Sequence, residues 1–268
     1  MNEIRNKKGF ICDMDGVIYH GKQILPGVIE FVNWLQNENK PFLFLTNSSE
    51  KTPRELSLKL LNMGLRVDEE HFYTSALATA DFIATQSPRC TAYVIGESGL
   101  MNALYNVGVV FSDTAPDYVI IGETRNYGYD SIRKAINLVL GGAKLIGTNP
   151  DISGPSETGV VPGCRALMAP IEMVSGKTAY YIGKPNPLMM RTGLKLLGVK
   201  RDESVIIGDR MDTDIIAGIE SEIDTVLVLS GVTDRVNINT FPYRPKIIIN
   251  GVGEIVSRPD GDPGILID

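Results

Sequence analysis

The sequence of 268 residues is poor in cysteine and histidine, with three and two of them respectively. Cys12, Cys90 and Cys164 are widely spaced and odd in number, which favours reduced thiols in a cytoplasmic protein over a disulfide framework. His20 and His71 are far apart and not at metal-ligand spacing. The sequence also contains no His-Glu-x-x-His and no Gly-x-Ser-x-Gly motif. A disulfide-rich domain, a zinc protease and a serine hydrolase are therefore not indicated.

Long hydrophobic runs and a surplus of basic residues are also missing. No apolar stretch approaches the length of a membrane span, and residues 1–8 lack the apolar segment of a signal peptide, so we expect a cytoplasmic protein without a membrane partner. The formal net charge of −6 argues against a nucleic-acid partner, because such proteins present basic patches to phosphates. An anionic small molecule is still compatible with this charge, since a metal ion and a few donors can set the local field.

The sequence does contain a regular alternation of short apolar runs with helix-length segments. The continuous apolar run 42–45 is typical of a parallel strand buried on both faces, and apolar spacing predicts a helix over 26–35. Residues 52–55 form a capping box with Pro at the first helical position, and Gly64 should end that helix. The other predicted strands are 10–12, 93–95, 118–121, 144–146, 180–182, 205–207, 225–228 and 247–249.

This alternation predicts an α/β protein made of parallel sheets covered by helices. The predicted strands are too many for one compact sheet, so we expect two α/β layers. The motifs described next lie on both sides of the middle of the chain. We therefore expect a Rossmann-like, doubly wound core formed by residues 1–75 and 180–268, with an α/β domain inserted at residues 76–179.

The first motif that could take part in catalysis is Asp13-Met14-Asp15-Gly16, directly after a predicted strand. Two carboxylates two residues apart point to the same side if the strand persists, and Gly16 permits a sharp turn. One carboxylate could attack phosphorus, while the other protonates the leaving alcohol and then deprotonates water. An acidic turn without any chemistry would have the same composition, because Asp and Gly are common in turns.

Two further motifs offer donors to a phosphate group. Thr46, Asn47 and Ser48 follow an apolar run and present hydroxyl, amide and main-chain donors. Lys184 follows another predicted strand, where its ammonium group could neutralise a transferring phosphoryl group. Taken singly, these motifs are more typical of a helix-capping loop and a surface lysine.

The fourth motif is a cluster of acidic residues after a further strand. Asp209, Asp212 and Asp214 would repel one another without a cation. Mg²⁺ would relieve this repulsion, because it prefers a few carboxylates together with water and substrate phosphate. The alternative is an acidic first turn of a helix, stabilised by the helix dipole. We favour the metal, since Asp13 and Asp15 need a cation as well.

The four motifs, in the order Asp-x-Asp-Gly, strand-end Thr, Lys and Gly-Asp-x-x-x-Thr-Asp, resemble the haloacid dehalogenase superfamily of phosphatases. The resemblance covers nearly the whole chain. In that family, the NagD-type branch is indicated by segments 25–27, 122–125, 148–151 and 229–232. The resemblance implies that the insert between the Thr and Lys motifs is an α/β cap that closes over the active site.

The resemblance also implies a role for each acidic residue. Asp13 would be the nucleophile and a metal ligand. Asp15 would be the general acid and base, and would bind the metal through its backbone carbonyl. Asp209 would ligate Mg²⁺, and Asp214 would support the metal or the lysine from close by.

Phosphate binding is implied for a second group of residues: Thr46, Asn47, Ser48 and Lys184. Thr46 and the main chain of Asn47 would hold the phosphate group, and Lys184 would neutralise it. In the cap, Asn149 and Asp151 follow a predicted strand and are candidates for contact with the leaving group. A Pro-containing turn explains those two residues equally well.

The sequence therefore predicts a phosphoric monoester hydrolase that is Mg²⁺-dependent and acts through an aspartyl-phosphate intermediate. Its partner would be a small soluble phosphomonoester, such as a nucleoside monophosphate or a sugar phosphate. Two alternatives stay open: a phosphotransferase or mutase of the same fold, and a non-catalytic module that senses a phosphorylated metabolite. Assembly into a homo-oligomer also stays open.

Overall fold

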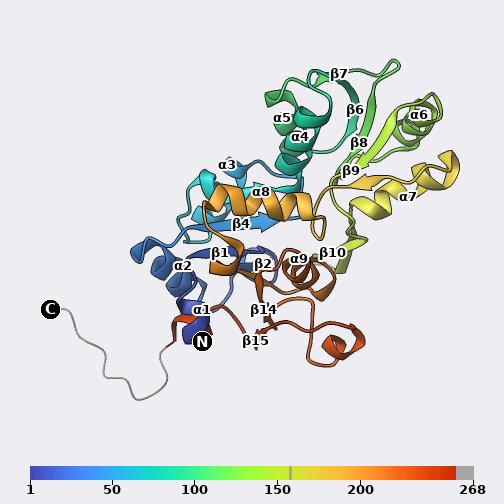
Figure 1. Ribbon diagram of the computed structural model, residues 1–268. Coiled ribbons are helices and arrows are strands. Elements are labelled where there is room, and N and C mark those ends of the chain that lie inside the picture. Colours follow the sequence, from blue (N-terminus) through green and yellow to red (C-terminus); the bar gives the residue numbers. More distant parts are fainter. Residues whose placement is uncertain (157–158, 258–268) are drawn as a thin grey trace. The chain divides into compact units, whose positions relative to one another are not determined.

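The computed structural model describes residues 1–156 and 159–257 (Figure 1). Two compact units make up the chain. The first combines Met1–Phe42 with the part that begins at Leu197, and the second is Leu43–Leu196. The expected tail of turns at residues 259–264 lies outside the described residues.

The first unit is built on parallel strands that alternate with helices, as predicted. Its parallel strands are β1 (Gly9–Cys12), β13 (Ser204–Gly208), β14 (Asp224–Val228) and β15 (Ile247–Ile249), and β2 (Tyr19–His20) forms a short hairpin with β3 (Gln23–Ile24). Its helical segments are α1 (Asn2–Arg5), α2 (Val28–Asn37), η2 (Arg201–Glu203), η3 (Met211–Ile215), α9 (Ile216–Glu220), η4 (Asn237–Thr240) and α10 (Gly253–Val256). Strands β1 and β13 are buried along their whole length, which explains their continuous apolar sequence.

Helix α2 shows how local sequence and packing agree. Its buried residues are Val28, Phe31, Val32 and Leu35, the face that the apolar spacing predicts. The helix begins at Val28, two residues later than the start predicted at Pro26. Gly27 has a φ of +77°, and a Cβ there would lie 2.5 Å from the Cα of Gly253. Glycine is required here by both the backbone conformation and the close contact.

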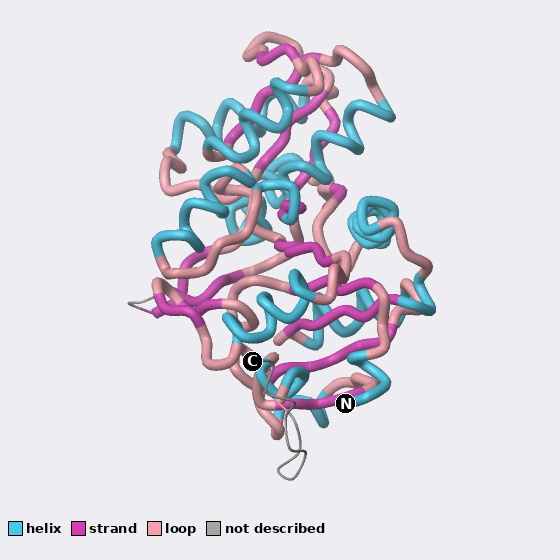
Figure 2. The backbone as a smooth tube through the Cα atoms, turned by 90° about the vertical axis from the view of Figure 1, so that its left-hand side faces the viewer, coloured by secondary structure: helices cyan, strands magenta, loops and turns pink. Residues whose placement is uncertain are grey.

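The second unit holds the other predicted strands. Its strands are β4 (Phe42–Thr46), β5 (Phe72–Thr74), β6 (Thr91–Ile95), β7 (Val110–Phe111), β8 (Tyr118–Ile121), β9 (Lys144–Gly147), β10 (Ser153–Ser156), β11 (Gly159–Pro162) and β12 (Tyr180–Tyr181). Its helical segments are α3 (Pro53–Asn62), η1 (Glu69–His71), α4 (Ser75–Gln86), α5 (Ser98–Asn106), α6 (Tyr129–Leu140), α7 (Cys164–Ser175) and α8 (Pro187–Leu197). Figure 2 shows the same helices and strands coloured by type.

Two separate parallel sheets organise these strands. The larger has six strands in the order β15-β14-β13-β1-β4-β5, and the smaller has five in the order β12-β9-β8-β6-β7. Side chains of α6 and α7, including Ala135, Val139 and Met168, pack on Val119 and Leu145 of the smaller sheet. The predicted α/β fold with a parallel core sheet and an inserted α/β cap is therefore confirmed.

Strand β12 pairs in parallel with β9, so it belongs to the smaller sheet. The domain limits at 75/76 and 179/180 stay a prediction. The antiparallel hairpin β10–β11 was not predicted, because its Gly, Pro and Ser residues are typical of a loop.

The capping box at the start of α3 is present as predicted. The Thr52 hydroxyl accepts a hydrogen bond from the Glu55 backbone N–H at 3.2 Å, and the Glu55 carboxylate accepts one from the Thr52 N–H at 2.8 Å. We expect Thr52→Ala to lower the free energy of unfolding in urea by about 1 kcal/mol. Thr178→Ala, at an exposed position outside α3, should change it much less. Equal effects of the two substitutions would contradict the prediction.

This stabilisation should also depend on pH. The hydrogen bond from the Thr52 backbone lowers the pKa of Glu55 below its usual value. A carboxyl group with a lowered pKa stabilises the fold above its unfolded-state pKa, and this contribution disappears as the pH falls through the folded-state value. The Thr52 hydroxyl also donates to the Glu55 carboxylate, at 2.9 Å, and lowers its pKa further. Thr52→Ala keeps the backbone N–H and removes this hydroxyl, so the difference in stability between wild type and Thr52→Ala should shrink in strongly acidic solution.

Candidate active site

Three carboxylates from distant parts of the sequence meet in the first unit. One oxygen atom each of Asp13, Asp209 and Asp214 lies within 4.8 Å of the others. Asp13 follows β1, and Asp209 follows β13. These strands run parallel, with Cys12 opposite Ile207, so their ends deliver both residues to the same edge of the sheet. Asp209 and Asp214 are buried, and Asp13 is half-buried.

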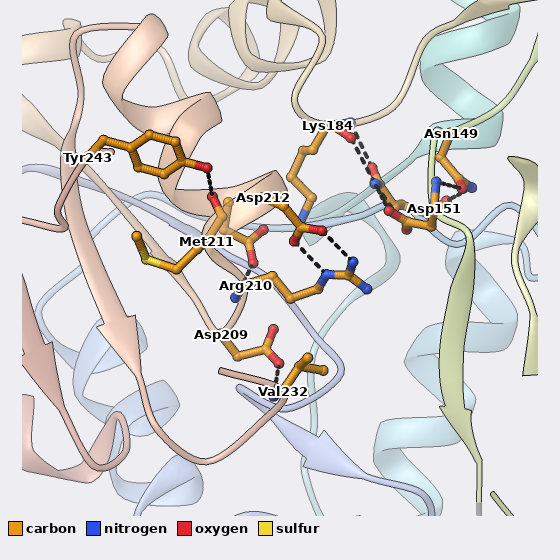
Figure 3. Close-up of polar contacts among 11 residues, drawn as sticks. Asn149, Asp151, Lys184, Asp209, Arg210, Met211, Asp212, Val232 and Tyr243 are labelled. Atoms are coloured by element: carbon orange, nitrogen blue, oxygen red, sulfur yellow. Dashed lines mark hydrogen bonds and ion pairs between the residues drawn. The ribbon is translucent and has the colours of Figure 1, made fainter. Parts of the chain in front are cut away.

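Backbone N–H groups hold two of these carboxylates in place (Figure 3). Asp209 Oδ2 accepts a hydrogen bond from the Val232 N–H at 2.7 Å. Asp214 Oδ2 accepts one from the Arg210 N–H at 3.1 Å, and the π-helical turn η3 carries Asp214 back toward Arg210. Fixed orientation of the carboxylates is what a metal site requires of the protein.

Glycine residues allow the backbone to close around the acidic cluster. A Cβ on Gly231 would lie 2.0 Å from Asp209 Oδ2, and one on Gly208 would lie 2.1 Å from the Cβ of Asp214. Gly16 has a φ of +79°, and its Cβ would lie 2.5 Å from Asp209 Oδ2. Three carboxylates at this spacing supply the oxygen ligands that a hard divalent cation prefers. The cluster could therefore hold such a cation.

Asp15 lies apart from this group of ligand atoms. Strand β1 ends at Cys12, so the alternation of a strand does not extend to Asp15. Its side chain is exposed, and Asp15 Oδ2 accepts a hydrogen bond from the Tyr19 hydroxyl at 3.1 Å. The Gly16 N–H donates to the Tyr19 carbonyl at 2.9 Å, which closes the turn that presents Asp15. A general acid must come within hydrogen-bond reach of the leaving group, and an exposed carboxyl group is accessible to a substrate.

In the second unit, Asn47 holds Lys184 through the main chain. Asn47 Oδ1 accepts from the Lys184 N–H at 2.7 Å, and Asn47 Nδ2 donates to the Lys184 carbonyl at 3.0 Å (Figure 3). Lys184 Nζ donates to the Leu45 carbonyl at 2.8 Å, and only 1% of the lysine is exposed. The side-chain amide of Asn47 therefore fixes the main chain of Lys184. Sequence reasoning missed this role, because the family resemblance assigned only the main chain of Asn47, to phosphate binding.

Thr46 ends strand β4 and is buried. Its hydroxyl oxygen accepts a hydrogen bond from the Ser48 N–H at 3.1 Å. Because this contact uses the hydroxyl as an acceptor, its own O–H can donate to an anion. The predicted phosphate-binding role of Thr46, Asn47, Ser48 and Lys184 stays a prediction, for which these contacts supply a rigid support.

The two cap candidates contact the Thr motif. The Asp151 carboxylate accepts two hydrogen bonds from Asn47 Nδ2, at 3.1 and 3.2 Å. Asn149 is fully buried, accepts from the Asp151 N–H at 3.1 Å, and donates to the Asn47 carbonyl at 2.7 Å (Figure 3). Contact of these residues with a leaving group stays a prediction.

Cys164 is a buried thiol of the second unit. Its thiol donates to the Ile121 carbonyl at 3.2 Å and is completely buried. Burial raises the pKa of Cys164 to about 12. A thiol in this state is a packed core residue and a poor nucleophile.

Comparison with known proteins identifies the family of this chain. A family model described as haloacid dehalogenase-like hydrolase matches residues 10–110, and one described as HAD-hydrolase-like matches residues 181–255. The chain is 45% identical over 254 residues to dihydroxyacetone phosphatase of Corynebacterium glutamicum, covering 95% of this chain and 92% of that protein. It is 38% identical to acid sugar phosphatase of Staphylococcus saprophyticus, covering 95% and 99%.

A third relative is known in both sequence and structure. The chain is 42% identical to ribonucleotide monophosphatase NagD of Escherichia coli, covering 92% of this chain and 98% of that protein. The solved structure of that NagD has a TM-score of 0.87 at 41% identity, covering 93% and 98% of the two chains.

The chain belongs to the haloacid dehalogenase-like hydrolases. Within that family it is of the NagD type, as the ordered motifs predicted. The predicted enzyme class, phosphoric monoester hydrolase, is also confirmed. Within residues 1–156 and 159–257, no helix combines the length and the apolar character that crossing a bilayer requires.

Proposed function

We propose that this enzyme hydrolyses small soluble phosphomonoesters with Mg²⁺ bound by the acidic cluster. The observation that carries the proposal is the convergence of Asp13, Asp209 and Asp214 within 4.8 Å of one another. The pairing of β1 with β13 supports it, because Asp13 and Asp209 follow two neighbouring parallel strands. Open α/β sheets bind their ligands outside the carboxyl ends of such strands.

The reaction we propose has two steps. Asp13 attacks phosphorus and forms an aspartyl-phosphate, while Asp15 gives its proton to the departing alcohol oxygen. Asp15 then removes a proton from water, which attacks the aspartyl-phosphate, so that inorganic phosphate leaves and the Asp13 carboxylate is regenerated. Lys184 and Thr46 would stabilise the charge on the transferring group.

Three side chains would hold the cation: Asp13, Asp209 and Asp214. The backbone carbonyl of Asp15 is a further candidate ligand. Mg²⁺ suits this set because it prefers a few carboxylates and completes its shell with water and substrate phosphate. Once bound, the cation would neutralise negative charge on the phosphate group and on Asp13.

The substrate class is inferred from the relatives. The three relatives are named dihydroxyacetone phosphatase, ribonucleotide monophosphatase and acid sugar phosphatase. We propose that the substrate is a nucleoside monophosphate, a sugar phosphate or a similar small ester. We also propose that the enzyme acts in the cytoplasm. Residues 76–179 would form the cap, which excludes bulk water and contacts the leaving group, with Asn149 and Asp151 as candidate contacts.

The test uses the purified chain with an aryl phosphate. We expect phosphate release in the presence of Mg²⁺, a loss of about 100-fold or more after chelation with EDTA, and recovery when Mg²⁺ is added in excess. Turnover unaffected by chelation would contradict the metal assignment.

Product analysis separates the two alternatives. Free phosphate that appears in step with substrate loss indicates hydrolysis. A phosphorylated sugar formed from an added acceptor indicates a phosphotransferase or mutase. Binding of phosphometabolites without any turnover, across a broad panel of them, indicates a sensing module.

A further inference from the structure

A second polar cluster lies around Ser49, three residues after Thr46 in the second unit. Ser49 is fully buried. Its N–H donates to Glu123 Oε2 at 3.2 Å, and its hydroxyl donates to the same oxygen. The Glu123 N–H in turn donates to Ser49 Oγ at 3.2 Å. Glu123, which follows strand β8, is therefore hydrogen-bonded to both the main chain and the side chain of Ser49.

Asn149 links Glu123 to a second residue of the same segment, Asn47. Asn149 Nδ2 donates to Glu123 Oε1 at 2.5 Å and to the Asn47 carbonyl at 2.7 Å. The Thr148 hydroxyl also donates to Ser49 Oγ at 3.3 Å. The carboxylate of Glu123 is thus connected to the main chain of residues 47–49 directly at Ser49 and through Asn149 at Asn47.

Two glycines bring other backbone segments tightly against this cluster. A Cβ on Gly122 would lie 2.6 Å from Ser49 Oγ. A Cβ on Gly183 would lie 2.6 Å from Asn47 Oδ1 and 2.7 Å from the Cβ of Asn149. The segment is packed between these backbones, so its position depends on the polar groups that face it.

The charge state of Glu123 matters for this contact. Its two oxygens accept from the Ser49 N–H, the Ser49 hydroxyl and the Asn149 amide. Burial raises the pKa of the Glu123 carboxyl above its usual value, while the hydrogen bonds from Ser49 and Asn149 act in the opposite direction. A glutamine at this position would direct its NH₂ group at a donor in either orientation, toward the Ser49 N–H or toward Asn149 Nδ2.

We propose that Glu123 is a positioning residue for phosphate binding: its carboxylate fixes the main chain of residues 47–49, which carries donors for the phosphate group of the substrate. The inference deepens the proposed function and rests on it. Glu123 should also affect the position of Lys184, because the side chain of Asn47 forms hydrogen bonds with the main chain of Lys184. Sequence reasoning assigned no role to Glu123 or Ser49.

The test compares Glu123→Gln with Glu97→Gln. Glu97 is partly buried in the same unit and accepts hydrogen bonds from Thr124 and Arg125, outside the 47–49 segment. We expect Glu123→Gln to raise KM for an aryl phosphate, and the inhibition constant of inorganic phosphate, by about tenfold or more, with a smaller effect on kcat. Glu97→Gln should leave both constants unchanged. A merely structural role would lower the melting temperature and the active fraction without changing KM.

The experiment separates failure of the inference about Glu123 from failure of the proposed function. If wild type turns over substrate and Glu123→Gln keeps its KM and inhibition constant, the inference is wrong and the function stands. If wild type shows no turnover, the proposed function fails, and calorimetry with inorganic phosphate decides the inference. Equal affinities of wild type and Glu123→Gln, or no binding to wild type, would then overturn it.

A second variant covers the case in which Glu123→Gln does not fold. Ser49→Ala removes one donor but keeps the Ser49 N–H contact, so it should shift both constants in the same direction by a smaller factor. If folded Ser49→Ala binds phosphate as tightly as wild type, the inference is overturned.

Discussion

Asp13→Asn is expected to reduce phosphate release by a factor on the order of 10⁴ or more, because an amide cannot form the aspartyl-phosphate while the side chain keeps its shape. The measurement is kcat for an aryl phosphate at saturating Mg²⁺. Asp130→Asn is the matched control, since Asp130 is exposed and lies on helix α6, outside the acidic cluster. Its kcat should equal that of wild type.

Two results would contradict the assignment of Asp13 as nucleophile. The first is activity of Asp13→Asn within a few-fold of wild type. The second is recovery of activity at high Mg²⁺ concentration, which would show that the substitution only weakens metal binding. Acid quenching during turnover offers a direct check, because a phosphorylated protein should be trapped from wild type and not from Asp13→Asn.

Lys184→Met is expected to lower kcat/KM by about 10²- to 10³-fold, because it removes the ammonium group that stabilises charge on the transferring phosphoryl group. Methionine keeps a long unbranched side chain in the buried position. The substitution removes the donor that Lys184 Nζ offers to the Leu45 carbonyl, which costs about 1–3 kcal/mol of stability. We therefore compare kcat/KM on fully folded protein, well below the melting temperature of the variant.

The control for this variant is Lys177→Met, at an exposed position of the same unit. It should retain wild-type kcat/KM. If Lys184→Met also stays within about threefold of wild type, a difference below 1 kcal/mol, the assigned role of the lysine is wrong. If the loss of kcat/KM disappears once activity is expressed per folded molecule, Lys184 acts mainly on the fold.

Much of the fold follows from local patterns in the sequence. The run at 42–45 became strand β4, and the spacing of Val28, Phe31, Val32 and Leu35 became the buried face of α2. The capping box at Thr52 formed as its sequence indicates. These features depend on neighbours within a few residues, so the sequence contains most of the information needed to predict them. The short strands β5 and β7 and the hairpin β10–β11 were not predicted, because their pairing partners decide them.

The order of the motifs was enough to identify the family and to single out Asp13, Asp209 and Asp214, which the structure brings together. It was not enough to show how the residues are supported. The π-helical turn η3 brings Asp214 near Asp209, although the sequence alone was also compatible with an acidic helix start. The hydrogen bonds between Glu123 and Ser49 join residues 74 positions apart. They form only because the end of β8 lies beside the segment that follows β4.

By itself, the sequence determined which side chains stand at the ends of strands, because strands, caps and turns depend mainly on short-range patterns. The tertiary structure alone decided which of those side chains touch. Asn47 contacts Lys184 across 137 positions, and Asp13 meets Asp209 because β1 and β13 pair in one register. Such contacts depend on strand order and register, which short-range patterns do not specify.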